Sequence, residues 1–126
     1  MAYAGIVLIS HSSKIAEGIK DLITQVMTEV PIETAGGTEE NGIGTSIDKI
    51  QAAIRHADMG KGVLLFYDIG SAKMNAEMAM EMADSDDIQL VEAPLVEGSY
   101  TAAVESGMGK SVKEVHDAVV KSFNRK

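Results

Sequence analysis

The sequence contains no cysteine and no tryptophan, and aromatic residues make up only 4% of its 126 positions. The lack of cysteine excludes disulfide bonds, thiolate catalysis and cysteine-bound zinc. The scarcity of aromatic rings leaves a flat cofactor few partners for stacking. Basic residues are also outnumbered: eleven Lys and Arg against nineteen Asp and Glu give a net charge of −8. Such a charge argues against a nucleic-acid partner.

Long hydrophobic segments are also missing. The longest apolar runs are far shorter than a membrane span, and the N-terminus lacks the features of a secretion signal, so we expect a cytoplasmic protein. The scattered acidic residues show no metal-ligand pattern, and we expect neither a metal nor a cofactor. With 45% hydrophobic residues, no repeat and no proline-rich linker, residues 1–126 are predicted to form one domain.

Buried strands alternate with amphipathic helices along the chain. Apolar runs predict strands at residues 3–10, 32–35, 63–67 and 88–91. Apolar residues at helical spacing predict helices at about 13–28, from 45, from 70, at 99–106 and from 111. The spacing in the first helix predicts a buried face made of Ile15, Ile19, Leu22, Ile23, Val26 and Met27.

This alternation predicts a doubly wound α/β fold, with a mainly parallel four-stranded sheet and helices on both faces. The flavodoxin-like strand order 2-1-3-4 is the leading choice. The chain then reverses direction between the first and third strands, and ligands gather beyond the carboxyl ends of the strands at such a point. Residues 10–13 and 68–71 follow those two strands, so the topology predicts a site there.

His11 lies in the predicted turn between the first strand and the first helix. An imidazole titrates near neutral pH and can act as a nucleophile without a helper base. The helix N-terminus that follows favours an anion, and Ser12 and Ser13 add hydroxyl donors. A nucleophile beside an anion site indicates phosphoryl transfer through His11. In the alternative interpretation, the ring only binds a loop carbonyl.

Asp68 ends the third predicted strand and is expected near His11. A carboxylate that accepts the Nδ1 proton of His11 leaves Nε2 free to attack. Asp68 can equally cap the helix that begins at Gly70, and the two roles are compatible.

A glycine-rich loop covers residues 36–44, and Thr45 with Asp48 is a helix start signal directly after it. Backbone N–H groups of such a loop can wrap a phosphate, although the loop matches neither the Walker pattern nor the dinucleotide fingerprint. An ordinary mobile surface loop is the other interpretation. The predicted phosphate-binding residues of the three segments are Ser12, Ser13, Gly37, Thr38, Thr45, Gly70 and Ser71.

Three other features have plain interpretations. His56 and His116 lie among polar neighbours and are expected on the solvated surface. Methionines recur at helical spacing at positions 74, 78 and 82, which indicates either core packing or a surface that faces a partner.

Four segments of the chain resemble one family, in the family's order: IVLISHSS (6–13), GGTEENGIGT (36–45), YDIGSA (67–72) and APLVEG (93–98). The chain resembles the phosphocarrier subunit of the dihydroxyacetone kinase that uses the phosphoenolpyruvate phosphotransferase system. More distantly, it is similar to the IIA domain of mannose-type sugar transporters. The resemblance covers nearly all of residues 5–109.

The resemblance implies a phosphoryl relay. The carrier protein HPr phosphorylates His11 on Nε2, and the group then passes to ADP held on the nucleotide subunit of the kinase. Asp68 supports the histidine, and Gly37, Thr38 and Thr45 line its pocket. The resemblance also implies a homodimer. Because the chain stops at Lys126, without fused HPr-like or enzyme I-like domains, we expect separate proteins to supply the phosphoryl group.

The alternatives are a transporter IIA domain, a receiver domain phosphorylated on Asp68, a flavodoxin-like electron carrier and a scaffold. A receiver domain needs carboxylates after its first strand to hold Mg²⁺, where this chain has Ser10, His11 and Ser12. A flavin would have Tyr67 and Tyr100 as its stacking rings.

Overall fold

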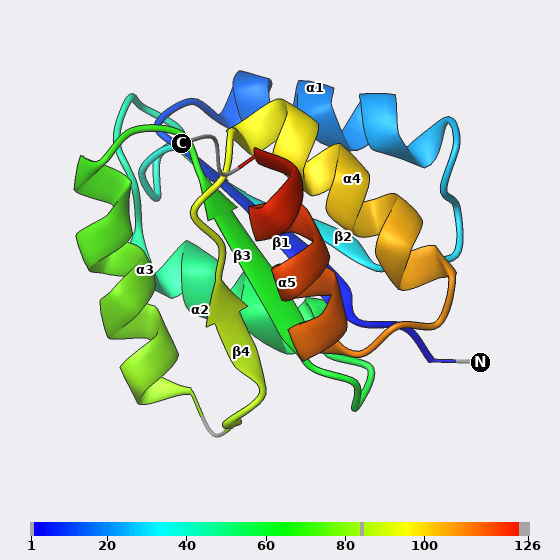
Figure 1. The fold of residues 1–126 in the computed structure, drawn as a ribbon. Coiled ribbons are helices and arrows are strands. Elements are labelled where there is room, and N and C mark those ends of the chain that lie inside the picture. The colour runs from blue at the N-terminus through cyan, green and yellow to red at the C-terminus, as the bar shows by residue number, and fades with distance from the viewer. Residues whose placement is uncertain (1, 84, 124–126) are drawn as a thin grey trace.

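A computed structural model describes residues 2–83 and 85–123. The elements follow one another in the order β1 (Gly5–Ser10), α1 (Ser13–Thr24), β2 (Ile32–Gly36), α2 (Ile47–Ala57), β3 (Val63–Tyr67), α3 (Ser71–Met82), β4 (Ile88–Leu90), α4 (Leu95–Gly107) and α5 (Val112–Phe123). Figure 1 shows the sheet at the centre with helices before and behind it.

The strands form one parallel sheet in the order β2-β1-β3-β4. The predicted α/β class and the strand order 2-1-3-4 are therefore confirmed. In the register of the sheet, Ser10 lies opposite Gly36 and Ile9 lies opposite Tyr67. The carboxyl ends of β1, β2 and β3 therefore meet at one edge of the sheet.

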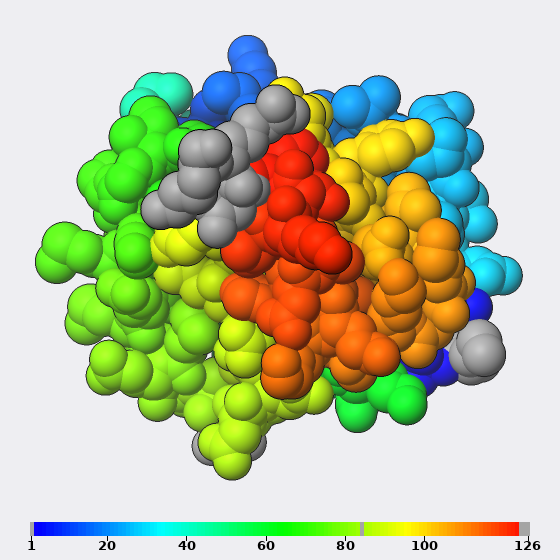
Figure 2. Space-filling model, viewed as in Figure 1, coloured from blue at the N-terminus to red at the C-terminus, as the bar shows by residue number. Residues whose placement is uncertain are grey.

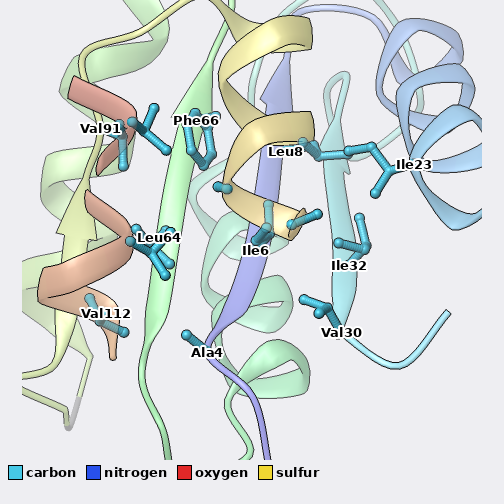
Figure 3. Packing of buried hydrophobic residues seen from close by; sticks show 14 of the residues in the cluster. Ala4, Ile6, Leu8, Ile23, Val30, Ile32, Leu64, Phe66, Val91 and Val112 are labelled. Atoms are coloured by element: carbon cyan, nitrogen blue, oxygen red, sulfur yellow. The ribbon is translucent and has the colours of Figure 1, made fainter. Parts of the chain in front are cut away.

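Alternate residues of the central strands pack on opposite faces of the sheet, in two separate hydrophobic cores. Ile6 and Leu8 of β1 pack in a core formed with α1, α4 and α5 (Figure 3). Val7 and Ile9 point to the opposite face, where they pack with α2 and α3. Because both faces are covered, the strands read as continuous apolar runs. On the first face, α4 and α5 lie side by side over the sheet (Figure 2).

The first helix differs from its prediction in length and in its buried face. It ends at Thr24, four residues early, because the chain turns there toward Pro31 and β2. Its buried residues are Ala16, Ile19 and Ile23, whereas Ile15, Leu22 and Val26 are about half exposed, at 51%, 50% and 55%. This helix packs chiefly on the edge strand β2, which covers only a narrow stripe of it.

The fourth helix begins earlier than predicted. It runs over Leu95–Gly107, so the predicted helix at 99–106 is only its second part. The first turn of this helix is not evident from the sequence, because it contains Gly98 and glycine is a poor helix former. The glycine is needed there, because a Cβ would lie 3.2 Å from the Phe66 ring and 2.9 Å from the Ala93 Cβ.

Strand ends differ from the prediction by small amounts: β1 starts at Gly5 and β4 ends at Leu90. In the described part of the chain, every helix is too short or too polar to cross a membrane.

Candidate functional site

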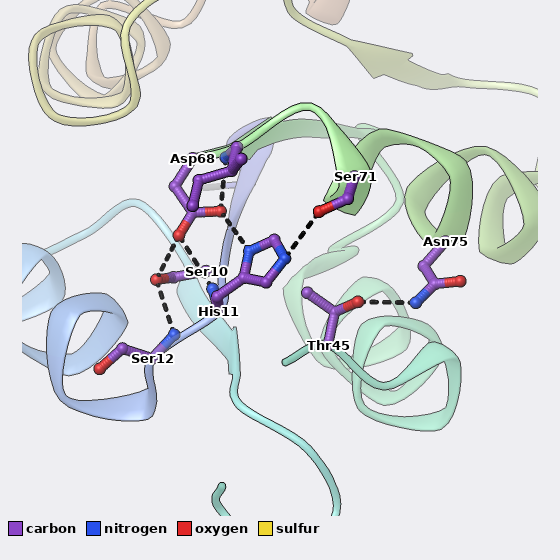
Figure 4. A network of polar contacts seen from close by, with 8 residues as sticks. Ser10, His11, Ser12, Thr45, Asp68, Ser71 and Asn75 are labelled. Carbon is purple, nitrogen blue, oxygen red and sulfur yellow. Dashed lines mark hydrogen bonds and ion pairs between the residues drawn. The ribbon is translucent and has the colours of Figure 1, made fainter. Parts of the chain in front are cut away.

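The turns after β1 and β3 meet at the carboxyl edge of the sheet. These two strands are neighbours, and each is followed at once by one of the predicted site residues, His11 or Asp68. The structure brings the two side chains together, as predicted (Figure 4). Both are largely shielded, with side-chain exposures of 21% for His11 and 16% for Asp68.

Asp68 binds His11 through both of its carboxylate oxygens. Oδ1 lies 3.0 Å from Nδ1 of the imidazole, and Oδ2 accepts the backbone N–H of His11 at 2.9 Å. An ionised carboxylate can only accept hydrogen bonds, so the proton of the neutral imidazole is on Nδ1. Nε2 therefore keeps its lone pair, which is the state that a nucleophilic histidine requires.

The Asp68 carboxylate is itself held by several donors. Burial would raise its pKa, but hydrogen bonds from the backbone and ring of His11, the Ser10 hydroxyl and the Ile69 N–H lower the pKa below its usual value. The Ser10 and Ile69 bonds measure 2.8 Å and 2.6 Å. Asp68 is thus ionised at neutral pH and keeps accepting the Nδ1 proton.

Ser10 is a site residue to which the sequence analysis gave no role. It is fully buried, donates to Asp68 Oδ2 and accepts the backbone N–H of Ser12 at 3.0 Å. It thereby links the carboxylate to the start of α1. Its signal in the sequence is a serine that ends an otherwise apolar run.

The other ring nitrogen of His11 faces α3. Nε2 lies 2.9 Å from the hydroxyl of Ser71, the first residue of that helix. Since Nε2 carries no proton in this tautomer, the Ser71 hydroxyl donates to it. Gly70, the N-cap of α3, makes no side-chain capping hydrogen bond. Because Ser71 is the first residue of α3, the N-terminus of the helix, with its partial positive charge, lies beside Nε2.

The start of α1 lies on the other side of His11. Ser12 is the N-cap of this helix, and its hydroxyl accepts the backbone N–H of Ile15 at 3.3 Å. Ser13 is the first residue of the helix. Two helix N-termini therefore flank the histidine, and the one that follows it in the chain begins at Ser13, as predicted.

The glycine-rich loop is fastened to the His11 segment at both ends. Gly37, with a φ of +77°, donates its N–H to the Ser10 carbonyl at 3.0 Å, and Gly44 donates to the His11 carbonyl at 2.9 Å. Thr38 closes the loop by accepting the Gly42 N–H at 3.0 Å. The N–H groups of Gly37 and Gly44 are thus already engaged within the protein.

Lys49 of α2 binds two residues of the same loop. Its ammonium group donates to the Gly36 carbonyl at 2.8 Å and to the Asn41 side chain at 2.6 Å. Asn41 has a positive φ of 66°, which an asparagine adopts more readily than most residues.

The comparison with protein families adds an independent observation. The family model described as the PTS system fructose IIA component matches residues 5–116. The chain belongs to this family.

Curated relatives of this IIA family member carry closely related names. The PEP-dependent dihydroxyacetone kinase 1 phosphoryl donor subunit DhaM of Listeria innocua is 44% identical over 104 residues, 82% of each chain. The PTS-dependent dihydroxyacetone kinase phosphotransferase subunit DhaM of Lactococcus lactis is 36% identical, over 97% of this chain and 98% of the relative. A relative from Escherichia coli is 34% identical over 87% of this chain, which is 25% of that longer protein. The family resemblance noted in the sequence is therefore confirmed.

Solved structures have the same fold as this chain. A crystal structure of a protein of unknown function is 35% identical and has a TM-score of 0.83, covering 95% of this chain and 94% of that one. A sigma-54 interaction domain protein from Enterococcus faecalis has a TM-score of 0.75 over 98% and 92% of the two chains. It is only 13% identical and supports the fold alone.

Thr45 occupies a different position in this IIA domain from the one predicted. It does not cap α2: the N-cap is Ser46, whose hydroxyl accepts the Lys49 N–H at 3.2 Å. The Thr45 hydroxyl oxygen instead accepts a hydrogen bond from the Asn75 amide at 2.6 Å. Asn75 was missed in the sequence, where its one signal is its position four residues after Ser71 on α3.

A shallow hollow of about 340 Å³ adjoins this contact, and Thr38, Thr45 and Asn75 are part of its lining.

The two other histidines lie on α2 and α5: His56 is exposed, and His116 is half-buried beside Asp117. Within residues 2–83 and 85–123, no cluster of His, Asp and Glu is arranged to hold a metal ion.

Proposed function

We propose that this protein is the phosphoryl donor subunit of a phosphoenolpyruvate-dependent dihydroxyacetone kinase. It accepts a phosphoryl group from HPr on Nε2 of His11 and passes it to ADP bound on the nucleotide subunit of the kinase. The names of its curated relatives support the kinase, and the site geometry supports the histidine.

The contact between the Asp68 carboxylate and Nδ1 of His11 is the observation that carries the proposal. Asp68 holds the Nδ1 proton, so the Nε2 lone pair is available without any prior proton transfer. Ser71 is the polar contact of Nε2 in the free protein, and a hydroxyl rotates aside at little cost.

Loading of the histidine is a direct displacement at phosphorus. The Nε2 lone pair forms the new N–P bond while the N–P bond of the donor's phosphohistidine breaks and returns its electron pair to the donor ring. Nδ1 keeps its proton, so the phosphorylated ring carries a positive charge. The adjacent Asp68 carboxylate stabilises that charge.

Unloading reverses these changes. A terminal phosphate oxygen of ADP attacks phosphorus, the Nε2–P bond breaks and the lone pair returns to the imidazole. Serine and threonine hydroxyls with two helix N-termini favour the negative phosphoryl oxygens in both directions. We assign this role to Ser12, Ser13, Thr38, Thr45, Gly70 and Ser71.

The relay is tested by separating its two halves. The protein is first loaded with phosphate from phosphoenolpyruvate, enzyme I and HPr, and is then purified. Mixing it with the ADP-loaded kinase subunit should remove the label and form ATP on that subunit. Loss of label to free ADP, or directly to dihydroxyacetone without the nucleotide subunit, would contradict the proposed sequence of transfers.

A further inference from the structure

Asn75 completes a ring of contacts around His11. The Ser71 hydroxyl meets Nε2 at 2.9 Å, and Asn75 follows one helical turn later on α3. Its amide donates to Thr45 Oγ1 at 2.6 Å. The residue before Thr45 donates its N–H to the His11 carbonyl at 2.9 Å. Figure 4 shows the contacts of His11 with Ser71 and of Asn75 with Thr45. The Gly44 N–H then connects the segment of Thr45 to the backbone of His11.

The buried face of helix α3 consists of small side chains. The buried residues are Ala72, Ala76 and Ala79, which insert only methyl groups into the core. Each of these short side chains makes few contacts and so contributes little dispersion energy to fixing the position of the helix. Polar contacts therefore add to what holds the start of α3 in place.

Besides the contact of Ser71 with His11, two polar contacts hold the start of α3. Lys73 pairs with Glu92 at 2.9 Å, but the two side chains are 42% and 56% exposed, and exposed pairs contribute little. The bond between Asn75 and Thr45 is short and partly buried, so it is the stronger of the two.

We propose that Asn75 is a positioning residue for phosphoryl transfer at His11, an inference that rests on the function proposed above. Its hydrogen bond to Thr45 sets the position of Ser71. When Nε2 bonds to phosphorus, the Ser71 hydroxyl loses the lone pair that accepted its proton. A phosphoryl oxygen replaces that acceptor, and the hydroxyl reaches it because Asn75 keeps α3 in place.

The test compares Asn75→Leu, which removes the amide at similar size, with Thr45→Val, which removes the hydroxyl. Each variant is loaded by phosphorylated HPr in single-turnover experiments at several donor concentrations. We expect the saturating rate to fall about tenfold in Asn75→Leu, the loss of one hydrogen bond. It should fall at least as far in Thr45→Val, which also removes a hydroxyl assigned to the phosphoryl oxygens. The donor concentration for half-saturation should not change, because Asn75 acts after docking.

Two further variants separate positioning from general damage to the fold. The double variant should lose no more rate than Thr45→Val alone, because Thr45→Val already removes the bond that Asn75→Leu removes. Thr45→Ser, which keeps the hydroxyl, should retain more rate than Thr45→Val. Met80→Leu, on the same helix but partly buried against the core rather than in the methionine stripe, is the control that should load at the wild-type rate.

The proposal is overturned if Asn75→Leu loads at the wild-type saturating rate, or if its loss multiplies with that of Thr45→Val. It is equally overturned if the half-saturating donor concentration alone changes. In each case His11 remains the labelled residue and the proposed function stands. A wild-type protein without label on His11 would instead refute the proposed function.

Discussion

At the scale of single residues, the reactivity proposed for His11 depends on what each ring nitrogen contacts. Asp68 binds Nδ1 at 3.0 Å and Ser71 lies 2.9 Å from Nε2. The first contact selects the nucleophilic tautomer, and the second places a donor where the phosphoryl oxygens arrive. The two neighbours therefore have separable roles, and their substitutions should have different effects.

Replacing the carboxylate should slow the reaction without moving the phosphate. In Asp68→Ala, the label should form more slowly and remain on His11, as rapid quenching and mass spectrometry can measure. The loss should be well below the roughly 10⁴-fold seen for an orienting carboxylate in a protease, because an imidazole near solvent reaches the required tautomer unaided. Loss of all labelling in Asp68→Ala, with labelling retained in His11→Ala, would instead identify Asp68 as the acceptor.

The lowered pKa of Asp68 also predicts how stability depends on pH. A carboxyl whose pKa is lower in the folded state stabilises the fold above its unfolded pKa of about 3.9. That contribution disappears as the pH falls through the folded pKa. Denaturant unfolding should therefore show the stability difference between wild type and Asp68→Ala shrinking below about pH 4. A difference that grows in acid would contradict this account.

His11 and Asp68 were predictable because the strand order alone brings the ends of β1 and β3 together. Ser10 and Asn75 were not, since their roles depend on partners distant in the chain. Ser10 meets Asp68 across 58 positions and Asn75 meets Thr45 across 30. Periodicity describes which residues are buried, but not which hydroxyl or amide they will bind.

At the scale of elements, the position of His11 depends on the packing of α1 against the end of β2. Gly36 ends β2, and a Cβ there would lie 2.7 Å from the Ser13 Cα and 2.9 Å from the Ser12 carbonyl oxygen. These are backbone atoms of the turn that carries His11. The absence of a side chain at position 36 therefore allows the helix N-terminus to reach its place.

Gly36→Ala should consequently impair stability and phosphorylation together. Overpacking of this kind costs about 1–3 kcal/mol, which denaturant unfolding measures. The displaced turn should also slow the loading of His11. Normal stability with normal loading would show that the turn tolerates the methyl group.

Gly18 of α1, the helix against which Gly36 packs, offers a matched control. A Cβ at this position has no atom within 4 Å, and the residue lies in the middle of α1. Gly18→Ala should therefore stabilise the protein by up to about 1 kcal/mol, since alanine is the better helix former. Its loading rate should equal that of the wild type.

The elements also show where sequence patterns stop being informative. The apolar stripe of α1 is wider than the surface that β2 covers, so periodicity overestimated its buried face. In α3 the methionines at 74, 78 and 82 are 70%, 49% and 61% exposed, and alanines form the buried face. Core packing of these methionines was the wrong alternative, and a partner-facing surface remains the prediction for them.

At the scale of the whole molecule, the fold was predictable because alternating strands and helices permit few topologies. The net charge of −8 belongs to the same scale. A strongly acidic protein that repeatedly meets a phosphoryl donor can use attraction to a basic patch on that donor. Homodimer formation also belongs here, and sedimentation of the purified protein tests it.

Charge attraction predicts a salt-sensitive loading rate. Raising the salt concentration from 0.1 M to 1 M shortens the Debye length from about 10 Å to about 3 Å. The rate of His11 phosphorylation at low HPr concentration should fall over this range. An unchanged rate would show that contacts other than long-range charge guide docking.

The location and chemistry of the phosphate decide whether His11 is the phosphoryl acceptor. The protein is incubated with phosphoenolpyruvate, enzyme I and HPr, and the label is mapped by mass spectrometry and tested for stability in acid and base. The account predicts one phosphate per chain on His11, stable in base and lost in acid. His11→Ala should carry none, whereas His56→Ala and His116→Ala should label normally. Full labelling of His11→Ala, or a base-labile label that vanishes in Asp68→Ala, would contradict the account.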